Sequence, residues 1–496
     1  MLFLMPLQAA PRPYPAAIVM LSLAVGCTPP DPGHSSPPDS GDSEVVDDSN
    51  PPEPDDYFLD IAFTQSTLIP SVVTVTWRTP EPATCTVAFG ADGDLSLSTL
   101  ENGEPSTDHA VPLVGLRPGS TGTLQISTET GAGLRTSAAQ TFTTGLLPHE
   151  VPTVDVAVHD AARAFDGFTL VPLLNDDPSG RWIAAIDATG TVVWAYKAEF
   201  QPHRARLAPD GGGVMFIDRA GTFESDCDGT VRSIAWDGTE RWRWSDEAAQ
   251  FDFAILGPDR FAALAYDSTI VNEGRPDERE YFGDAIIEFD SAGNSQVVWS
   301  IFDDIDPVQI PGTVTAPVGN TNMVDWSHGN YLTWDPETES YLVVLRHLDA
   351  IVSVDGTTGD MLWSLSNDWG TYNSQGGDPV LSWPHSVERT GAQLAVFNQT
   401  HDHDGDACSH GRIVTLDASV GTADSAWEYQ NAECSKVLFL GSTHPLPSGN
   451  LLVDFSQAGI MDEVTLDGEL VQRFDAGLGW TFGFAQPVEQ LAPLAP

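Results

Sequence analysis

A histidine and an arginine stand at the two ends of one predicted hairpin. His328 closes the run Asp-Trp-Ser-His, an acidic turn follows at residues 335–339, and Arg346 comes directly after Leu345. The ends of antiparallel strands that are joined by a short turn lie side by side. An imidazole and a guanidinium, whose donors form a fixed fork, could bind one anion there. The spacing therefore predicts a site that handles an oxyanion.

A repeated motif predicts the architecture around this pair. An Asp, a small turn that contains Gly and a later aromatic residue recur at intervals of 50 to 65 residues. Each copy is typical of two strands joined by a turn, and this period leaves room for four short strands. The sequence predicts an all-β fold with a six-bladed β-propeller over residues 148–496, with a tandem of β-sandwiches as the alternative. The copies are Asp187–Trp194, Asp237–Trp242, Asp290–Trp299, Asp355–Trp363, Asp417–Trp427 and Asp467–Phe474.

The N-terminus has the features of an export signal. Residues 16–25 are apolar, and Leu23–Cys27 resembles the lipobox of bacterial lipoproteins, in which Cys27 would be acylated. An ordinary cleaved signal peptide or an N-terminal anchor is the alternative for residues 1–27. Residues 28–56 are rich in Pro, Asp and Ser and cannot bury enough surface to fold, which predicts a disordered tether. We expect an exported protein that is lipid-anchored to the outer membrane or cell surface, or otherwise periplasmic or secreted.

A second β-rich part precedes the predicted propeller. Residues 72–77 and 84–89 alternate between apolar and polar side chains, as half-buried strands do. Together with Trp77 and the Leu-x-Pro turn at residues 116–118, these strands resemble a fibronectin type III-like β-sandwich at residues 57–147. Nothing in this part has the spacing of a catalytic site, so we expect a spacer or docking module.

The charge of the chain excludes several kinds of partner. Its 496 residues include 21 Lys and Arg against 71 Asp and Glu, which gives a net charge of −50. Nucleic acids and anionic membranes are bound by clustered Lys and Arg, so we expect no nucleic acid partner and membrane contact only through the lipid anchor. The same charge repels an anionic substrate, which only a local cationic pocket could hold.

Four cysteines follow the one in the predicted lipobox. In an exported protein Cys408 and Cys434 could form a disulfide, because they fall in the same repeat region. Cys85 lies in the predicted sandwich and Cys227 in another repeat, so their pairing is open. No Cys-x-x-Cys occurs, which argues against a redox dithiol or a zinc ribbon.

One acidic loop has the pattern of a calcium site. Asp402, Asp404 and Asp406 alternate as the carboxylates of a calcium loop do. The Glu that closes an EF-hand loop is missing, so a solvated acidic loop is favoured over a structural calcium ion. We expect no cofactor.

The segments around His328 and Arg346 also point to a family. Together with Trp-Pro-His at residues 383–385 and the strand Leu394–Asn398, they resemble the bacterial arylsulfotransferase (arylsulfate sulfotransferase) propellers over roughly residues 150–480. The resemblance implies ping-pong transfer of a sulfuryl group between phenols, without a nucleotide sulfate donor. The implied partners are small aromatic sulfate esters and phenols, and a homodimer is left open.

The resemblance also implies a role for each residue. His385 matches the nucleophilic histidine, which would carry the sulfuryl group as sulfohistidine. His328 and Arg346 match the residues that hold the sulfate oxygens and offset their charge in the transition state. The alternative is a structural role for all three, in which both histidines are hydrogen-bonded residues near the axis and Arg346 pairs with a neighbouring Asp. We expect His347 to be structural, because adjacent strand residues point to opposite faces.

One part of the family pattern is missing. Family members usually have a His-His-Asp segment that assists the phenolic oxygen, and the corresponding place here is Gln-Phe-Asp-Phe at residues 250–253. His203, in a similar turn one repeat earlier, could compensate or be structural, and Asn398 is a further weak candidate for substrate binding.

Two kinds of function therefore remain open. The first is a surface-tethered arylsulfate sulfotransferase, with a hydrolase that passes the group to water as its variant. The second is a non-catalytic propeller that binds ligands or proteins. In an enzyme, His328, Arg346 and His385 should converge on one anion site at the propeller axis.

Overall fold

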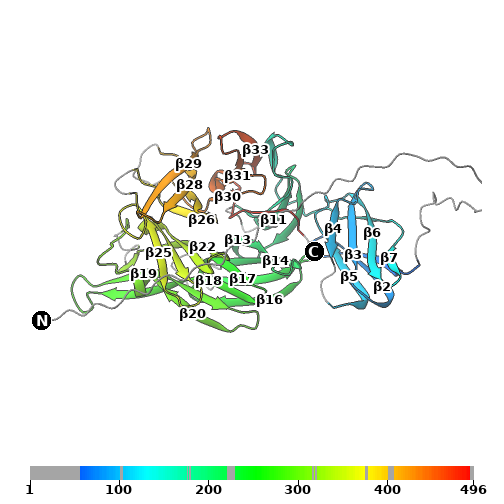
Figure 1. The fold of residues 1–496 in the computed structure, drawn as a ribbon, viewed down its shortest axis with the longest axis horizontal. Coiled ribbons are helices and arrows are strands. Elements are labelled where there is room, and N and C mark those ends of the chain that lie inside the picture. The colour runs from blue at the N-terminus through cyan, green and yellow to red at the C-terminus, as the bar shows by residue number, and fades with distance from the viewer. Residues whose placement is uncertain are drawn as a thin grey trace, which may run out of the picture. The chain divides into compact units, whose positions relative to one another are not determined.

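The computed structural model describes residues 56–100, 104–175, 177, 180–219, 229–314, 318, 321–374, 378–399 and 407–491. Cys27, Cys227 and the three aspartates of the predicted calcium loop lie outside the described residues. Strands dominate the described chain, whose helices are α1 (Ile301–Asp304) and the short 3-10 turns η1 (Arg346–Leu348) and η2 (Ser456–Ala458). The predicted all-β class is confirmed (Figure 1). None of the helices in the described chain is long and apolar enough to span a membrane.

The N-terminal part of the fold consists of two antiparallel sheets. Their inward side chains share one core, in which Trp77 packs with Val75, Leu124 and Ile126. Because strand side chains alternate between faces, the other side chains of these strands are solvated. One sheet has the order β1 (Leu59–Gln65), β2 (Val73–Ala83), β5 (Ser106–Leu113), and the other contains β3 (Thr86–Ala91), β4 (Leu97–Leu100), β6 (Thr121–Thr130), β7 (Gly133–Thr136) and β8 (Gln140–Thr143).

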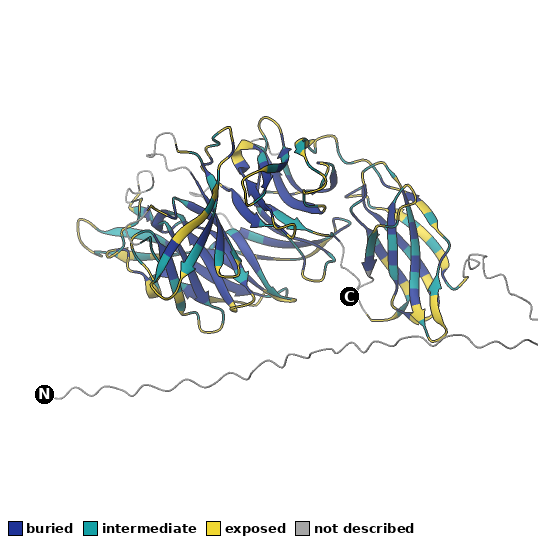
Figure 2. Cartoon of the chain, turned by 45° about the horizontal axis from the view of Figure 1, so that its top comes forward, coloured by how far each residue is buried: buried dark blue, intermediate teal, exposed yellow. Residues whose placement is uncertain are grey.

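Six further sheets of four or five strands follow in chain order, and most of their strand residues are buried (Figure 2). Repeated four-stranded antiparallel sheets are the building unit of β-propellers. The first two sheets contain β10 (Phe168–Leu174), β11 (Arg181–Asp187) and β12 (Val192–Lys197), and then β13 (Gln201–Leu207), β14 (Gly213–Arg219), β15 (Gly229–Ala235) and β16 (Glu240–Asp246). The third and fourth contain β17 (Ala249–Gly257), β18 (Arg260–Val271), β19 (Arg279–Phe289), β20 (Ser295–Ser300) and β21 (Met323–Asp325), and then β22 (Gly329–Asp335), β23 (Ser340–Leu345), β24 (Ala350–Asp355) and β25 (Met361–Ser366). The last two contain β26 (Pro384–Thr390), β27 (Gln393–Asn398), β28 (His410–Asp417) and β29 (Thr422–Tyr429), and then β30 (Ser442–Pro445), β31 (Leu451–Asp454), β32 (Ile460–Val464) and β33 (Leu470–Asp475).

The two ends of this part exchange strands between its first and last sheets. The early strand β9 (Asp155–His159) pairs with β33 of the last sheet. The late strands β34 (Thr481–Phe482) and β35 (Gln486–Val488) pair with β10 of the first sheet. Both terminal sheets are thus completed by the opposite end of the chain, which leaves fewer open strand edges.

The repeated Asp-Gly-aromatic motif forms the predicted hairpins. In the turn between β11 and β12, Asp187 Oδ1 accepts hydrogen bonds of 2.9 Å from the backbone N–H groups of Thr189 and Thr191. Gly190 adopts φ +84°, which glycine reaches without strain. Trp194, on the return strand, donates from Nε1 to the carbonyl oxygen of Trp236 in the next sheet at 2.9 Å. The motif therefore builds the hairpin and also joins neighbouring sheets.

The first strands of successive sheets lie next to one another near the middle of this part (Figure 1). A buried ion pair joins three of these strands. Arg204 donates from Nε and Nη2 to the two carboxylate oxygens of Asp252 at 2.9 and 3.0 Å, and Asp252 also accepts from the backbone N–H of Leu332 at 2.9 Å. The guanidinium packs 4.2 Å from the ring centroids of Tyr331 and Phe484. A buried pair with this many hydrogen bonds fixes the register of β13, β17 and β22.

Candidate active site

The hairpin of β22 and β23 places His328 and Arg346 together, as its sequence predicts. Gly329 pairs with Leu345 at the open end of the hairpin. The backbone N–H of Arg346 donates to the carbonyl oxygen of His328 at 3.2 Å. The two side chains therefore start from adjacent backbone positions at one end of the sheet.

Buried groups on both sides hold the turn that carries His328. Trp326 is fully buried and donates from Nε1 to the carbonyl oxygen of Ile310 at 2.8 Å. Asp284 accepts hydrogen bonds from the Ser327 hydroxyl and, at 2.6 Å, from the backbone N–H of Gly329. A Cβ atom on Gly329 would lie 2.4 Å from Asp284 Oδ1. Only glycine lets the backbone come this close to the carboxylate.

Asp325 orients the imidazole of His328. His328 Nδ1 lies 2.6 Å from Asp325 Oδ2. Burial raises the pKa of Asp325, but His328, with His347 and Arg346, outweighs burial and lowers it below its usual value. The ionised carboxylate can only accept, so His328 donates its Nδ1 proton to Asp325.

His347 belongs to the same cluster, contrary to the prediction that it points away from it. Residues 346–348 form the 3-10 turn η1 instead of continuing the strand, so neighbouring side chains are not on opposite faces. The rings of His347 and His328 stack with centroids 4.4 Å apart. His347 Nδ1 contacts the carbonyl oxygen of Asp325 at 2.8 Å, and burial, with His328, lowers the pKa of His347 to about 3. His347 is therefore a neutral ring that supports His328.

Arg346 extends across the cluster. Its Nε donates to Gln399 Oε1 at 2.8 Å and its Nη2 to the carbonyl oxygen of Leu438 at 3.2 Å. The guanidinium lies 3.8 Å above the ring centroid of Trp383. Its Nη1 lies 3.3 Å from His347 Nε2. These contacts fix the direction of the guanidinium fork.

His385 stands near the start of β26 and is only 6% exposed. The backbone N–H of Leu440 donates to its Nε2 at 3.1 Å, whereas its buried Nδ1 has no hydrogen-bond partner among the described residues. Burial, followed by the charges of Arg346 and His328, lowers the pKa of His385 well below 6.5. His385 is therefore a neutral imidazole with its proton on Nδ1 and a lone pair on Nε2.

A disulfide fixes the loop that contacts both His385 and Arg346. The predicted Cys408–Cys434 bond is present. Beyond it, the N–H of Val437 donates to Ser409 Oγ at 2.8 Å. The loop then presents the Leu438 carbonyl to Arg346 and the Leu440 N–H to His385. Cys85 is buried and forms no disulfide with another described residue.

The predicted histidines and Arg346 are linked in one closed circuit of contacts. His203 lies 5.3 Å from Phe251, and Phe251 lies 6.5 Å from His328, both between ring centroids. The circuit continues through His347 and Arg346 to Gln399, whose Nε2 donates to the carbonyl oxygen of Leu440 at 3.0 Å. Leu440 contacts His385, which lies 5.2 Å from Phe484, and the Phe484 N–H donates to the His203 carbonyl oxygen at 3.1 Å. Side chains from five sheets thus belong to one connected circuit of contacts.

The departure from the family pattern changes the site in two ways. Gln250 donates from Nε2 to Asp284 Oδ1 at 2.9 Å, so it helps to hold the carboxylate behind His328. Phe251 turns its ring toward His203 and His328 and belongs to the circuit. Burial, then the charge of Arg219, lowers the pKa of His203 to about 4. His203 is a neutral ring beside Phe251 at neutral pH.

Asn398 serves a neighbouring loop. Its Oδ1 accepts from the N–H of Ser382 at 3.2 Å, and its Nδ2 donates to the carbonyl oxygen of Val380 at 3.1 Å. A further contact of 3.2 Å joins Nδ2 to His410 Nε2. These contacts position the segment before Trp383 and give no support for direct substrate binding by Asn398.

Three residues around the cluster have left-handed backbones. His328, Trp383 and Leu440 adopt φ values of +48°, +44° and +59°. Such conformations are strained for side chains with a Cβ and tend to occur at functional sites. Two of these residues, Trp383 and Leu440, were not predicted as site residues from the sequence. Phe251 and His347 were also not predicted as site residues. No sequence pattern indicates a left-handed Trp or Leu.

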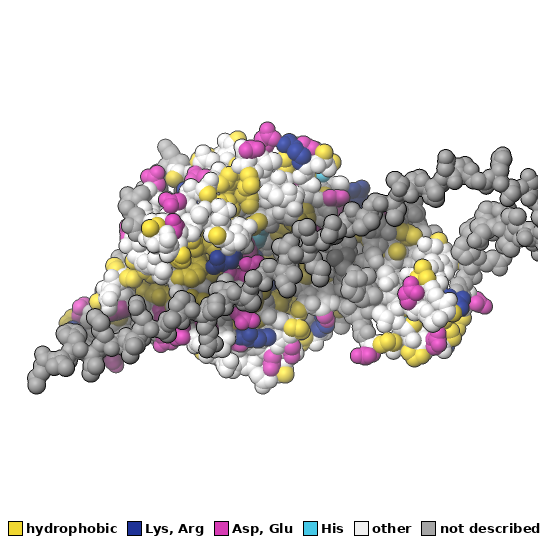
Figure 3. All heavy atoms as spheres, viewed as in Figure 1, with side chains coloured by type: hydrophobic (Ala, Val, Ile, Leu, Met, Phe, Trp, Pro, Cys, Tyr) yellow, Lys and Arg dark blue, Asp and Glu magenta, His cyan; other side chains and the backbone are white. Residues whose placement is uncertain are grey.

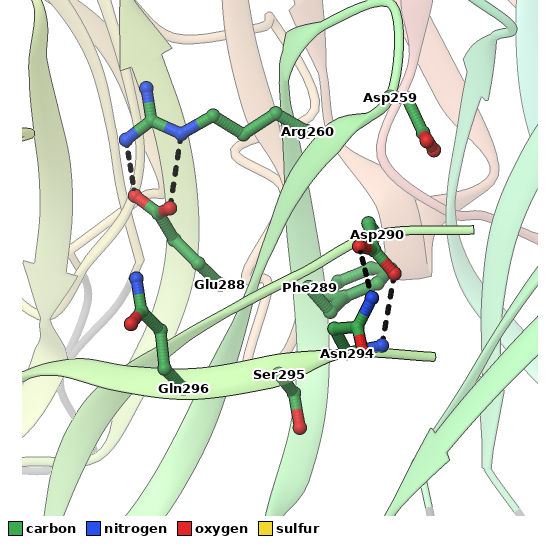
Figure 4. Close-up of a pocket in the computed structure, with 8 residues that line it drawn as sticks. All are labelled: Asp259, Arg260, Glu288, Phe289, Asp290, Asn294, Ser295 and Gln296. Atoms are coloured by element: carbon green, nitrogen blue, oxygen red, sulfur yellow. Dashed lines mark hydrogen bonds and ion pairs between the residues drawn. The ribbon is translucent and has the colours of Figure 1, made fainter. Parts of the chain in front are cut away.

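A separate cavity of about 330 Å³ lies at the other ends of β17 to β20. Arg260 and Glu288 form a bidentate pair there, and Asn294 donates from Nδ2 to Asp290 Oδ2 at 2.7 Å (Figure 4). Its polar groups satisfy one another, and none of the predicted site residues lines it.

One described group has the composition of a metal site. Asp325, His328 and His347 bring three ligand atoms within 4.8 Å of one another. In this arrangement, however, the two Nδ1 atoms are already bonded to the carboxylate and to the carbonyl oxygen of Asp325. The group therefore fits an orienting network better than a set of metal ligands.

Comparisons with known proteins identify the family of this chain. No curated protein sequence matches the chain. A solved protein of unknown function from Bacteroides caccae is 15% identical with a TM-score of 0.38, over 65% of this chain and 99% of its own. A virginiamycin B lyase from Staphylococcus aureus is 10% identical with a TM-score of 0.33, over 82% of this chain and 99% of its own. At these TM-scores neither structure supports a conclusion about the function of this chain. The sequence model of the family described as Arylsulfotransferase (ASST) matches residues 153–476, and the chain therefore belongs to the arylsulfotransferase family.

Proposed function

We propose that this protein is an exported arylsulfate sulfotransferase that moves a sulfuryl group from a phenolic sulfate ester to a phenol through sulfohistidine at His385. The observation that carries the proposal is the closed circuit of contacts around His203, His328, Arg346 and His385. In this circuit Gln399 and Leu440 link the neutral imidazole of His385 to the guanidinium of Arg346, in a strongly acidic protein. Such a pair is what nucleophilic attack on an anionic sulfate ester requires.

In the first half-reaction, the Nε2 lone pair of His385 attacks sulfur. The bond between sulfur and the aryl oxygen breaks, and its electron pair leaves with the phenolic oxygen. Arg346 and the N–H of Leu440, which lies 3.1 Å from Nε2 in the free protein, are placed to donate to the sulfuryl oxygens. Protonated His328, paired with Asp325, gives its Nε2 proton to the departing phenol.

The second half-reaction reverses these steps with a new phenol. Neutral His328 accepts the phenolic proton at Nε2 while the phenolic oxygen attacks sulfur and His385 leaves. His385 Nδ1 has no acceptor among the described residues, so the ring keeps its proton in the intermediate. A sulfuryl group on a protonated ring is readily released, because the leaving group is neutral imidazole.

The surrounding architecture is part of the proposal. We infer that the six sheets form a six-bladed propeller, with the site at the end of its axis where the inner strands begin. We further propose that the two-sheet N-terminal part is a fibronectin type III-like spacer, and that acylation of Cys27 anchors the protein to the outer membrane or cell surface. The three-stranded and five-stranded sheets of the N-terminal part support the fibronectin type III-like assignment. Residues 23–27 support the acylation of Cys27.

The decisive experiment uses the protein from residue 57 onward and a chromogenic aryl sulfate, with and without a phenol acceptor. We expect the acceptor to stimulate chromophore release, and we expect His385→Asn to abolish it. His159→Asn, an exposed histidine outside the cluster, is the matched control and should keep full activity. Release that ignores the acceptor would instead indicate transfer to water.

A non-catalytic binding propeller is the second candidate. The replacement of the family's histidines by Gln250 and Phe251 favours it, because no imidazole stands at those positions. The absence of chromophore release across several donors, with phenols still bound, would support this function and contradict the first.

A further inference from the structure

Arg219, at the end of β14, is a buried cation that the proposed chemistry does not use. It is 8% exposed, and its Nε has no hydrogen-bond partner among the described residues. Its guanidinium lies 5.3 Å from the ring centroid of Phe251 and 5.4 Å from that of Tyr266. No carboxylate forms an ion pair with it in the described parts of the chain. A buried charge without an opposite charge is costly, so its retention calls for an explanation.

The surroundings make this cation conspicuous. The chain holds 71 acidic side chains against 21 basic ones. The other well-buried arginines, Arg204 and Arg232, contact carboxylates at 2.9 and 3.2 Å. On the face shown in Figure 3, basic side chains form isolated spots among acidic ones. Because no carboxylate pairs with Arg219 in the described parts of the chain, an anionic ligand could supply the opposite charge.

Arg219 faces the catalytic circuit at a different point from Arg346. It borders Phe251, which lies between His203 and His328 in the circuit. After burial, its charge is the next cause of the lowered pKa of His203, which places the guanidinium close to that ring. Arg346 lies beyond His328 and His347. The two guanidiniums are therefore separated by the aromatic groups that line the site.

We propose that Arg219 forms a second anion subsite, which binds a carboxylate or similar anionic group on the ring of the phenolic substrate. The proposal rests on the proposed function. With the sulfuryl group held by Arg346 near His385, an aryl ring that passes along Phe251 would carry its far substituent toward Arg219. The preferred substrates are then hydroxybenzoate-type phenols and their sulfate esters. A charge-assisted hydrogen bond to the guanidinium provides the selectivity.

Equilibrium binding tests the subsite without any sulfuryl transfer. Titration calorimetry would compare 4-hydroxybenzoate with the neutral isostere 4-hydroxybenzamide on the full protein. We expect the anion to bind about tenfold more tightly, a ratio typical of one charged hydrogen bond. Arg219→Gln should abolish this preference, and Arg219→Lys should keep part of it. Arg241→Gln, which removes an exposed arginine that pairs with Asp210, is the matched control and should leave the ratio unchanged.

Each outcome decides the proposal. Equal binding of the two ligands by the unaltered protein, or a preference that survives Arg219→Gln, would show that Arg219 only packs against Phe251 and Tyr266. If Arg219→Gln does not fold, the ratio of the unaltered protein and that of Arg219→Lys still decide. Sulfuryl transfer without a preference would overturn the subsite and keep the enzyme. A preference without transfer would keep the subsite and overturn the enzyme.

Discussion

At the scale of single residues, the site depends on which nitrogen of each imidazole is held by its neighbours. Asp325 engages Nδ1 of His328, and the backbone of Leu440 engages Nε2 of His385. In the proposed mechanism, the first contact orients His328 so that its Nε2 acts as acid and base. The N–H of Leu440, which contacts Nε2 of His385 in the second, would donate to a sulfuryl oxygen once the sulfuryl group is bound. Both histidines can thus act in chemistry although their environments differ.

The protonation of His385 offers a test at this scale. Its pKa is lowered well below 6.5 by burial and by Arg346 and His328, so the neutral form persists as the pH falls past the value at which an ordinary histidine gains a proton. Nitrogen NMR of histidine-labelled protein, with the signal assigned through His385→Asn, should show a neutral ring protonated on Nδ1 at pH 5.5. Free histidine in the same sample would be mostly charged at this pH. A charged His385 at pH 5.5 would contradict this account of the nucleophile.

At the scale of elements, hairpins and one braced loop carry the site. The β22–β23 hairpin brings two of its side chains together through register alone. The loop from Cys434 to Leu440 has no such ladder. It is held by the disulfide, by Ser409, which bonds the N–H of Val437, and by Asn431 and Gln457, which accept from the N–H groups of Ser435 and Leu438. Its contacts with Arg346 and His385 are therefore only as rigid as this bracing.

Removal of the disulfide should uncouple the loop from the site. Loss of a crosslink across a segment of 26 residues costs about 3 kcal/mol in the chain-entropy view. We expect Cys408→Ser with Cys434→Ser to lower kcat at temperatures where circular dichroism shows the sheets still folded, because Leu440 no longer holds His385. Cys85→Ser, which changes a buried cysteine outside this loop, is the control and should leave kcat unchanged. An unchanged kcat in the double variant would contradict the bracing role.

At the scale of the whole molecule, the net charge of −50 sets the electrostatics. Like charges repel within the compact state, and they repel anionic substrates that approach from solution. Several surface arginines pair with carboxylates, for example Arg163 with Asp160 at 2.7 Å, but exposed pairs of this kind contribute little. The balance of charge therefore destabilises the fold at low ionic strength.

Salt should raise the stability of this protein. The Debye length falls to about 10 Å at 0.1 M salt, which screens the repulsion between distant acidic side chains. We expect the melting temperature to rise by a few degrees between about 20 and 500 mM NaCl, measured by scanning calorimetry. An equal concentration of a neutral osmolyte separates screening from general solute effects. A melting temperature that falls with salt would show that the ion pairs outweigh the repulsion.

Much of the fold and part of the site follow from the sequence itself. The Asp-Gly-aromatic repeat determines the hairpins, because Asp accepts backbone hydrogen bonds in five of the six turns and Gly takes the left-handed position in each. The adjacency of His328 and Arg346 follows from strand register, which is a local property of the chain. The pairing of Cys408 with Cys434 was predictable because both cysteines fall in one repeat region.

The tertiary structure alone decided the rest of the site. Residues 346–348 turn instead of extending, which brings His347 onto His328. Phe251, Leu440 and Arg219 come from different sheets, or from the loops before them, and are far apart in the sequence. Sequence periodicity reports which face of a strand is buried, but not which side chains of other sheets it will meet there. That meeting depends on how the sheets pack around a common centre, which no local pattern encodes.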